Sequence, residues 1–560
     1  MSFGLLIKIF GALVELALPY ILEHIIDHVV PGGNRDAIFI WGGIMIICSV
    51  LAWLGNIWAN RIAARVSRNT TEKLRHDLFR KVMYLSSSEL DSFTIPSLES
   101  RLTSDTYQIH HVVGMMQRLG VRAPILLIGG IAVTLSLDHV LTLVMVSTLP
   151  FIGLAVFFIS KKGIPLFSDV QRGVDSMTRV VRENAQGVRV VKALSKTDYE
   201  RRHFDKANRE LVKTEKKANI TMALTNPSMT LILNLGLAGV ILAGAYRVRG
   251  GGCDAGVIIA FMSYFTIVTM AMLSITRIFT MLSRGTASAN RISEVLASED
   301  DIKVLPSAGE ETGGEKTYLS FDNVSFAYGE GKNVLSDISF SLKRGQTLGI
   351  IGSTGSGKST IIQLIMRYYD VKDGKITFCG RDIRTYEPNE LHAKTGIVRQ
   401  NDFLYHDTIE ENIRFGRDIS HEDVVFAAKT ACADEFIRET EGGYDHILTA
   451  KGTNVSGGQK QRILIARALA AKPELLILDD AYSALDYKTD AAVRRQIKEN
   501  YGGTTTIVVA QRVSSIMNAD LILVIEDGRA VAAGKHDELL RTCEVYREIS
   551  ESQMGGAILE

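Results

Sequence analysis

The stretch Gly352-Ser-Thr-Gly-Ser-Gly-Lys-Ser-Thr360 determines the fold predicted for the C-terminal part of this chain. It has the spacing G-x-x-x-x-G-K-[ST] of a phosphate-binding loop. Residues 347–351 before it are an apolar run of the strand type, and residues 361–366 after it contain no Gly or Pro. A strand, a glycine-rich loop and a helix are the context that such a loop requires. The sequence therefore predicts a site for a nucleoside triphosphate.

Each part of this loop has a task in phosphate binding. Its glycines allow backbone N–H groups to turn inward around a polyphosphate, and the helix N-terminus adds partial positive charge. Lys358 is expected to reach the β- and γ-phosphates, and the Ser359 hydroxyl to bind Mg²⁺. The predicted nucleotide contacts here are Gly352, Ser353, Thr354, Gly355, Ser356, Gly357, Lys358, Ser359 and Thr360.

A second predicted strand, residues 475–479, reads Leu-Leu-Ile-Leu-Asp and ends in a carboxylate. Consecutive apolar residues indicate a parallel strand that is buried on both faces. Ligands gather at the carboxyl ends of the strands in open α/β sheets. Asp479 is therefore placed to hold Mg²⁺, directly or through water.

The composition indicates a chain that is part membrane protein and part soluble domain. The 560 residues are too many for one core, and 22% of them are charged while the mean hydropathy is slightly positive. The formal charge of +1 argues against a nucleic-acid binder that works through a large basic surface. The five cysteines lie far apart without a C-x-x-C pair, so we expect buried thiols rather than disulfides or a metal site.

Apolar runs predict six membrane crossings in the first half of the chain. They cover about residues 1–30, 37–58, 113–137, 139–160, 220–246 and 255–279. The polar segments between them are rich in Lys and Arg and keep helical periodicity, so we expect the crossing helices to continue into the cytoplasm. Six crossings place both termini in the cytoplasm. The weak point of this topology is the turn after the fifth crossing, because it places Arg247 and Arg249 on the external side of the membrane.

Several residues within the crossings have two interpretations. Arg118, Arg122 and Arg277 lie near the inner interface, where we expect them to extend toward lipid headgroups. Glu15 is deeper and faces either a central cavity or a polar neighbour on another helix. Aromatic and Met side chains suit either an adaptable cavity or the lipid; they are Phe158, Met262, Tyr264, Phe265 and Met270.

These patterns divide the chain into a transmembrane domain, residues 1–297, and an α/β nucleotide-binding domain, residues 318–554. Residues 298–317 are acidic and Gly-rich and are predicted to be a linker, and residues 555–560 a C-terminal tail. No cleavable signal sequence is expected, because the first apolar segment is too long and has no small-residue cleavage site. The first crossing begins so early that little room remains for an interfacial helix before it.

The segment Val455-Ser-Gly-Gly-Gln459 identifies a family. Together with Tyr328, Gln400 and Ser483-Ala-Leu-Asp486, it resembles the nucleotide-binding domain of ATP-binding-cassette (ABC) transporters. Six crossings followed by one such domain resemble a half-transporter of the exporter type. Residues 100–105 and 187–193 also resemble the loops that carry coupling helices onto the nucleotide-binding domains in this family.

The resemblance implies a role for each motif. Tyr328 would stack on adenine, Gln400 would contact Mg²⁺, and Asp486 would belong to the D-loop. The signature residues Val455, Ser456, Gly457, Gly458 and Gln459 would close over the γ-phosphate of ATP bound to another copy of the domain. ATP would then lie between two domains, and the working unit would contain two chains.

Two positions depart from the family pattern. The residue after Asp479 is usually the glutamate that polarises the attacking water, but here it is Asp480. A shorter side chain withdraws the carboxylate by about 1 Å, and such a misplacement can cost about a hundredfold in rate. The usual switch histidine is Gln511, whose neutral amide cannot become cationic. Ala450 is a lesser departure, where an acidic residue is common.

These departures predict a degenerate site that binds ATP and hydrolyses it slowly, whereas the intact signature would complete a partner's site. The chain thus resembles the degenerate subunit of a heterodimeric exporter in the cell (inner or plasma) membrane, with ATP and Mg²⁺ as ligands. The partner would be a second half-transporter with the usual Glu and His. A slowly hydrolysing homodimer, an ATP-gated regulator or channel, and an importer-like protein remain alternatives. The substrate, a small molecule, lipid or peptide, is not specified by the sequence.

Overall fold

The computed structural model of the chain describes residues 2–298, 302–306, 317–329 and 331–554. They form a helical unit, Met1–Met83 with Pro96–Ala297, and an α/β unit, Tyr84–Ile95 with Ser298–Glu560. The short segment Tyr84–Ile95, which we had included in the transmembrane domain, is thus grouped with the α/β unit. Most of the predicted linker, residues 298–317, and the whole predicted tail, residues 555–560, lie outside the described residues.

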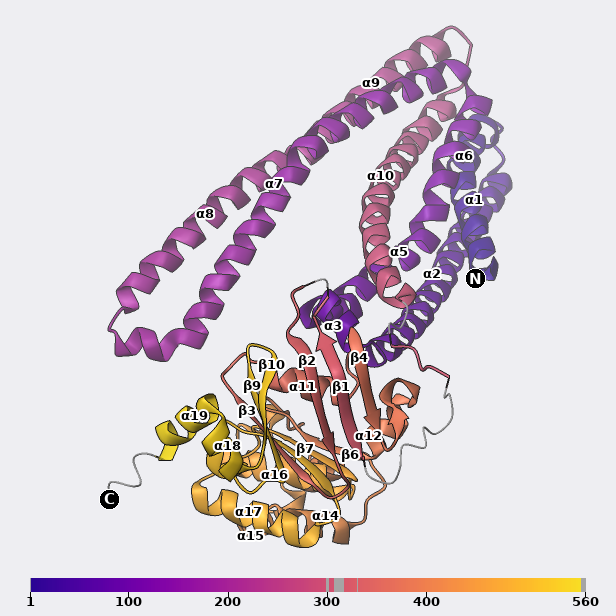
Figure 1. Cartoon of the computed structure of the whole chain (residues 1–560). Coiled ribbons are helices and arrows are strands. Elements are labelled where there is room, and N and C mark those ends of the chain that lie inside the picture. The colour runs from indigo at the N-terminus through magenta and orange to yellow at the C-terminus, as the bar shows by residue number, and fades with distance from the viewer. Residues whose placement is uncertain (1, 299–301, 307–316, 330, 555–560) are drawn as a thin grey trace. The chain divides into compact units, whose positions relative to one another are not determined.

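Long helices dominate the first 297 residues (Figure 1). In chain order these are α1 (Ser2–His24), α2 (Arg35–Met83), α3 (Ser87–Phe93), α4 (Ile95–Ser100), α5 (Thr106–Met115), α6 (Val121–Leu137), α7 (His139–Ala193), α8 (Thr197–Ala223), α9 (Thr225–Arg249) and α10 (Ala255–Ala297). Three π-helical turns interrupt or extend them: Ile25–Val29, Arg101–Asp105 and Met116–Gly120. The other helices and the strands belong to the α/β unit.

Within the described residues, six helical stretches are long and apolar enough to cross a membrane: Ser2–Val29, Arg35–Met83, Ile95–Leu137, His139–Ala193, Thr197–Arg249 and Ala255–Ala297. This confirms the six predicted crossings. The stretch His139–Ala193 has 55 residues, far more than the ~20 that a bilayer requires, so helices do continue beyond the apolar runs. Large apolar side chains such as Phe39, Trp53 and Leu143 are exposed on these helices, as expected for surfaces that face lipid.

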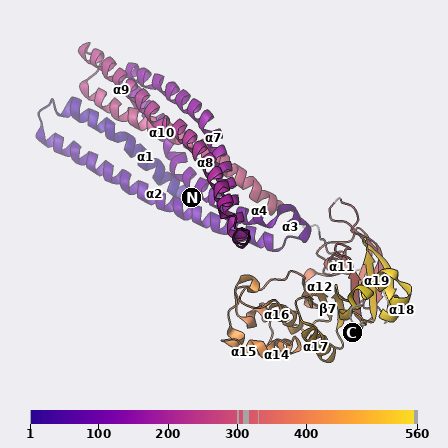
Figure 2. The same cartoon turned by 90° about the vertical axis from the view of Figure 1, so that its left-hand side faces the viewer.

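Helices α1, α6 and α10 pack together in the helical unit (Figure 1), and α1 and α10 can be followed in the turned view of Figure 2. The Tyr264 hydroxyl of α10 donates a 2.5 Å hydrogen bond to the backbone oxygen of Leu16 in α1. Tyr264 and Phe265 are completely or almost completely buried, so they face neither lipid nor a cavity. Met262, Met270 and Phe158, by contrast, are exposed. We expected all five of these aromatic and Met side chains to face either a cavity or the lipid. That expectation was wrong for Tyr264 and Phe265, because both are buried.

Arg247, one of the two arginines that weakened the topology prediction, is paired with a carboxylate. Arg247, at the end of α9, donates two hydrogen bonds to one carboxylate oxygen of Asp138, at 2.7 and 3.1 Å. The other oxygen of Asp138 accepts from the backbone N–H groups of Val140 and Leu141 and so caps the start of α7. The charge rule counts Lys and Arg and gives carboxylates little weight, so the pair fixes the start of α7 but leaves Arg247 and Arg249 as exceptions to the rule.

The α7–α8 hairpin extends away from α5 and α10 (Figure 1). Its helices pack against each other, and α7 also packs against α9. Apolar side chains are exposed around the turn between α7 and α8, namely Val188, Val190, Leu194 and Tyr199. The predicted coupling segment 187–193 is therefore the C-terminal end of α7, and it exposes both valines and basic side chains.

The α/β unit contains two sheets. A six-stranded sheet has the order β10-β9-β3-β8-β7-β6, in which only β10 is antiparallel to its neighbour, and a four-stranded antiparallel sheet has the order β2-β1-β4-β5. The strands are β1 (Leu319–Phe326), β2 (Leu335–Leu342), β3 (Thr347–Gly352), β4 (Asp373–Phe378), β5 (Arg381–Asp382), β6 (Thr395–Val398), β7 (Leu475–Asp479), β8 (Thr505–Val509), β9 (Leu521–Glu526) and β10 (Arg529–Gly534).

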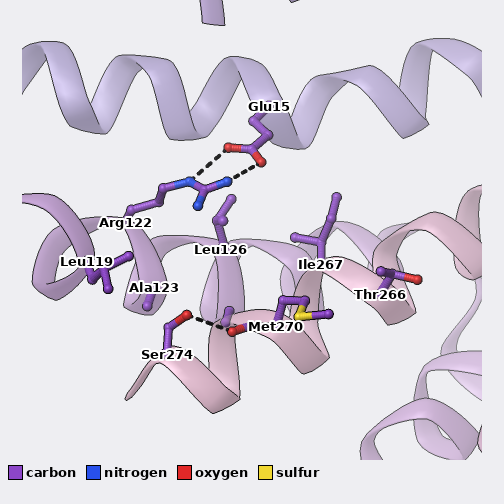
Figure 3. Close-up of a pocket in the computed structure, with 10 residues that line it drawn as sticks. Glu15, Leu119, Arg122, Ala123, Leu126, Thr266, Ile267, Met270 and Ser274 are labelled. Carbon is purple, nitrogen blue, oxygen red and sulfur yellow. Dashed lines mark hydrogen bonds and ion pairs between the residues drawn. The ribbon is translucent and has the colours of Figure 1, made fainter. Parts of the chain in front are cut away.

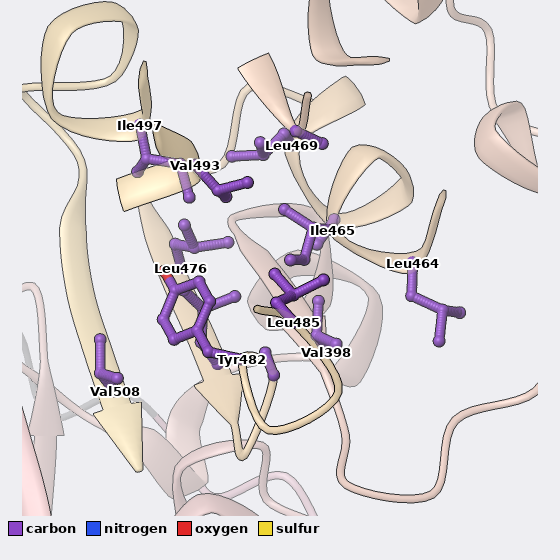
Figure 4. Close-up of a cluster of buried hydrophobic side chains, with 14 of the residues drawn as sticks. Val398, Leu464, Ile465, Leu469, Leu476, Tyr482, Leu485, Val493, Ile497 and Val508 are labelled. Atoms are coloured by element: carbon purple, nitrogen blue, oxygen red, sulfur yellow. The ribbon is translucent and has the colours of Figure 1, made fainter. Parts of the chain in front are cut away.

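The helices of this unit are α11 (Lys358–Ile365), α12 (Pro388–Ala393), α13 (Ile409–Arg414), α14 (His421–Thr430), α15 (Asp434–Glu439), α16 (Gly457–Ala470), α17 (Tyr487–Asn500), α18 (His536–Thr542) and α19 (Glu544–Met554). Both faces of the six-stranded sheet are buried. In β7, Leu475 and Ile477 join the core that also contains α11 and the four-stranded sheet, while Leu476 and Leu478 join the core beneath α16 and α17 (Figure 4). This alternation explains the uninterrupted apolar run of the strand and confirms the predicted fold class.

The five cysteines are free thiols. Only Cys543 is buried; Cys379 is exposed, and the other three are intermediate. Our expectation of buried thiols was therefore wrong for four of the five, because a wide sequence spacing says nothing about the burial of each side chain.

Candidate functional site

The glycine-rich loop connects β3 to α11, as its sequence predicts. At Gly352 a Cβ atom would lie 2.0 Å from the backbone oxygen of Ile525, so only glycine allows the strand to pass its neighbour there. Gly357 has φ of 97°, and a Cβ atom on it would lie 2.6 Å from the side chain of Leu335. These two glycines allow the turn that directs the N-terminus of α11 toward the loop.

Polar groups in the loop fit a bound polyphosphate. The Lys358 ammonium donates to the backbone oxygens of Gly352 and Ser353 at 3.0 and 2.7 Å, which keeps it above the loop. Burial lowers the pKa of Lys358, and an anionic ligand would favour its charged form. Among the described residues, the buried Ser356 hydroxyl has no hydrogen-bond partner. A phosphate oxygen would supply one.

The residues predicted to hold Mg²⁺ lie together. Asp479 ends β7 and is 6% exposed, and one of its carboxylate oxygens lies 3.4 Å from the Ser359 hydroxyl. Gln400 lines the same cleft as Ser359 and Asp479. Burial raises the pKa of the Asp479 carboxyl, because the charged form loses hydration. Hydroxyl, carboxylate and amide oxygens are the hard ligands that Mg²⁺ prefers, so this set fits the ion.

The two unusual residues contact each other in this cleft. The Gln511 amide donates a 3.1 Å hydrogen bond to a carboxylate oxygen of Asp480. Asp480 has φ of 53°, a left-handed conformation that is uncommon for residues other than glycine and is often found at functional sites. Burial also raises the pKa of its carboxyl. The carboxylate in the position of the base is therefore held by the amide in the position of the switch residue.

A residue that the sequence analysis missed supports the switch segment. Gln553, in α19, donates from its amide to the backbone oxygen of Gln511 at 2.7 Å. The amide oxygen of Gln553 accepts a 2.8 Å hydrogen bond from the backbone N–H of Val513. One side chain thus joins the C-terminal helix to the backbone on both sides of Arg512. A single glutamine in an amphipathic helix carries no sequence signal for such a contact.

Tyr328 lies beside the start of α11 and not within the cleft. Its hydroxyl donates a 2.6 Å hydrogen bond to Gln363 and lies 3.1 Å from the Thr360 hydroxyl. Its ring meets those of Phe326 and Tyr369 edge to face, and the residue is 37% exposed. An exposed aromatic ring anchored next to the loop remains available for stacking.

The signature residues are elsewhere in the α/β unit. Ser456 caps α16: its side-chain oxygen accepts from the Gln459 N–H, and the Gln459 side chain accepts from the Ser456 N–H. This reciprocal cap fixes Ser456 while leaving its hydroxyl proton free to donate. Asp486 likewise caps α17. Of the described residues that line the cleft, none comes from the signature segment 455–459 or is Asp486.

Helix α3, which is grouped with the α/β unit, forms a side-chain hydrogen bond within that unit. In α3 the Asp91 carboxylate accepts a 2.6 Å hydrogen bond from the Tyr369 hydroxyl. The predicted coupling segment 100–105 belongs instead to the helical unit, where Asp105 binds Ser288 at 2.8 Å and pairs with Arg291. The coupling role of segment 100–105 therefore stays a prediction. Helix α3 begins at a capping box formed by Ser86 and Glu89.

Comparisons with known proteins place these features in one family. The profile of the ABC transporter transmembrane region matches residues 1–272, and the ABC transporter profile matches residues 335–483. The uncharacterized ABC transporter ATP-binding protein YfiB of Bacillus subtilis is 35% identical over 97% of this chain and 94% of its own length. The uncharacterized protein Rv1273c of Mycobacterium tuberculosis is 34% identical over 98% and 95%. A bacterial Atm1-family ABC exporter, solved with ATP bound, has a TM-score of 0.82 at 26% identity over 98% of both chains.

Proposed function

Because the chain belongs to the ABC transporter family and is a half-transporter of the exporter type, we propose that it is the degenerate-site subunit of a heterodimeric exporter. As a member of this family the chain is a multi-pass membrane protein and an ATPase-coupled transporter. In this proposal the chain's own site binds ATP and hydrolyses it slowly, whereas the partner's site carries out most of the hydrolysis.

The hydrogen bond from Gln511 to Asp480 carries the proposal. A hydrogen bond donated to a carboxylate stabilises its charged form and so makes it a weaker base. Here the Gln511 amide donates to the Asp480 carboxylate, and the aspartate side chain is one methylene shorter than the glutamate usual in the family. An amide also cannot offer the γ-phosphate the positive charge that an imidazolium would supply. Both effects lower the rate of hydrolysis and leave ATP binding intact.

The remaining residues receive the following proposed roles. Lys358 and the loop N–H groups bind the phosphates of ATP, and Tyr328 stacks on its base. Ser359, Gln400 and Asp479 would hold Mg²⁺, which would neutralise part of the phosphate charge. The ATP that is bound in the Atm1-family relative supports this assignment.

The signature residues are proposed to act on the partner. Ser456 and the glycines after it lie at the N-terminus of the 14-residue helix α16, where backbone N–H groups favour a phosphate. Because these residues do not line the chain's own cleft, their proposed ligand is the γ-phosphate held by the second half-transporter. The membrane is proposed to be the cell membrane, with both termini and the ATPase domain in the cytoplasm.

Restoring the usual residues tests the degenerate site. In the assembled exporter, the double change Asp480→Glu and Gln511→His should raise hydrolysis at this site by about tenfold or more, since positioning of a base contributes about a hundredfold. The partner's catalytic glutamate is replaced by glutamine, so that the remaining turnover reports this chain's site alone.

The single changes serve as controls. Each should raise turnover less than the double change does, because residues that act as one unit are not additive. The proposal is wrong if wild-type turnover at this site already equals that at the partner's site. It is also wrong if the double variant binds ATP normally and hydrolyses it no faster than the wild type.

A further inference from the structure

An intramembrane pocket lies between α1, α6 and α10 of the helical unit (Figure 3). Apolar side chains form much of its wall, among them Leu126, Ile267 and Met270. Arg122 from α6 and Glu15 from α1 point toward each other at one side of the pocket, and Ser274 of α10 lies across from them. The pocket thus joins an apolar surface to a charged group, which is the composition of a site for an amphiphile.

The charged group has the geometry of anion recognition. Arg122 donates from Nε to one carboxylate oxygen of Glu15 at 3.1 Å and from Nη2 to the other at 2.5 Å. Two parallel hydrogen bonds of this kind match a carboxylate or a phosphate equally well. Both side chains are partly exposed, 34% for Arg122 and 24% for Glu15. The structure therefore shows the guanidinium already holding an oxyanion, supplied by Glu15.

The charges around the pocket are not balanced. Lys8, on α1, is 4% exposed, and its ammonium donates to Asn56 and Asn60 rather than to a carboxylate. Lys8 also interacts electrostatically with Arg118, Arg122 and Glu15. Arg118 donates to the backbone oxygen of Gly114 and, in the part of the chain that the structure describes, forms no ion pair. Three basic side chains thus lie around one carboxylate in a membrane-spanning region, where an excess of basic groups is unfavourable without a counterion.

We propose that this pocket binds the anionic head of an amphiphile, a carboxylate or a phosphate, and that such amphiphiles are the transported class. The head replaces Glu15 on Arg122, and the apolar chain lies along Leu126, Ile267 and Met270. Lys8 precedes Glu15 by two helical turns on the same face of α1 and offers the displaced carboxylate a second cation. This inference rests on the transport function proposed above and names its substrate class.

Direct binding tests the inference without using the ATP site. The wild-type assembly, in nanodiscs of phosphatidylcholine and without ATP, is titrated with radiolabelled dodecyl phosphate. We expect saturable binding that unlabelled dodecyl trimethylammonium does not displace. Inorganic phosphate should also fail to displace the probe, because it lacks the apolar chain. Displacement by the cationic amphiphile would contradict the claim that the ligand must be anionic. Displacement by inorganic phosphate would contradict the claim that the ligand must have an apolar chain.

Matched variants assign the binding to the pocket. Arg122→Gln together with Glu15→Gln keeps a hydrogen-bonding pair in the same place and removes both charges, so the protein should still fold. Its affinity for dodecyl phosphate should fall by about tenfold or more, the loss expected for a charge-assisted contact. Glu15→Gln alone should strengthen binding, since it removes the competing carboxylate. Arg277→Gln, an arginine of α10 that does not line the pocket, should change nothing.

Two further measurements identify which amphiphile occupies the pocket and test the proposed ATP function separately. Loss of probe binding in discs that contain phosphatidylglycerol would identify an anionic bilayer lipid as the occupant, and retained binding would identify a freely diffusing amphiphile; both support the anionic class. Unchanged affinity in the double variant would overturn the inference. Trapping of labelled ATP on the same preparations reports the proposed ATP function separately, so either can fail alone.

Discussion

Lys358 has two partners in the structure, and both are carbonyl oxygens of its own loop. A carbonyl is a neutral acceptor, so a triphosphate would compete for this ammonium as a stronger one. At the scale of the residue, the loop is therefore preorganised: the lysine is already positioned where the β- and γ-phosphates are proposed to lie.

Removing this ammonium should remove ATP from the chain's own site. Lys358→Ala is expected to lower trapping of labelled ATP there by more than about tenfold, because the main cationic contact of the phosphates is lost. Lys498→Ala, on the exposed surface of α17, is the matched control and should trap ATP normally. Trapping that is undiminished in Lys358→Ala, with both sites of the assembly occupied, would contradict the assignment of the loop.

Among the secondary-structure elements, α19 has a contact that its position at the end of the α/β unit did not suggest. Gln553 bonds the backbone of Gln511 and Val513 at once, so the helix restrains the segment that follows β8. Since that segment also carries the Gln511 side chain to Asp480, the restraint reaches the proposed catalytic position.

Loosening this restraint should be visible in hydrogen exchange. Gln553→Ala should raise the exchange rate of the Val513 amide by roughly fivefold, the effect of losing one hydrogen bond of about 1 kcal/mol. Gln553→Glu retains an acceptor for that amide but loses the donor to the Gln511 backbone oxygen, so it should protect the amide less than the wild type does and more than Gln553→Ala does. Equal exchange in the wild type and in Gln553→Ala would show that α19 does not restrain the segment.

The elements of the ATP site were predictable from local patterns, and their long-range partners were not. The order of strand, glycine loop and helix around Lys358 followed from a short stretch of sequence, as did the buried strand that ends at Asp479. The contact between Asp480 and Gln511 joins the ends of two neighbouring parallel strands, β7 and β8. Local patterns do not indicate that these two residues belong to one site; only the family resemblance indicated it.

Contacts between distant helices were beyond the sequence. Arg122 was expected to extend toward lipid headgroups, but it pairs with Glu15, 107 residues away. Of the two interpretations of Glu15, the polar neighbour on another helix is confirmed, and the same pair also lines a pocket. Hydrophobic periodicity places a residue on a face of a helix but does not identify the helix that faces it.

At the scale of the whole molecule, two surfaces agree with the proposed second chain. The end of α7 and the start of α8 expose Val188, Val190, Leu194 and Tyr199, although the apolar run of the membrane crossing ended much earlier. The signature at the start of α16 is capped and ordered, yet it does not line the chain's own cleft. Both observations agree with a working unit in which each chain completes the other.

A bulky cation in the signature should therefore stop ATP hydrolysis at the partner's site. Ser456→Arg is expected to reduce ATP turnover of the purified pair by more than about a hundredfold, because it blocks closure over the partner's γ-phosphate and removes a hydrogen-bond donor there. Ser420 caps α14 in the same way, so Ser420→Arg controls for the loss of a helix cap and should leave most turnover intact. Normal turnover of the Ser456→Arg pair would refute the shared site.

The hydrogen bond between Asp480 and Gln511 also shapes the genetic paths that are open to this site. In the genetic code, Asp480→Glu and Gln511→His each require only one base substitution, so mutation alone would revisit the usual residues often. Because the two side chains touch, either substitution alone changes the length of one member of the pair, so its effect on turnover depends on the other position. Each single change should then raise turnover by less than it does when the other change is already present. If the proposed degenerate site is correct, such epistasis would slow the return of a lineage to fast hydrolysis.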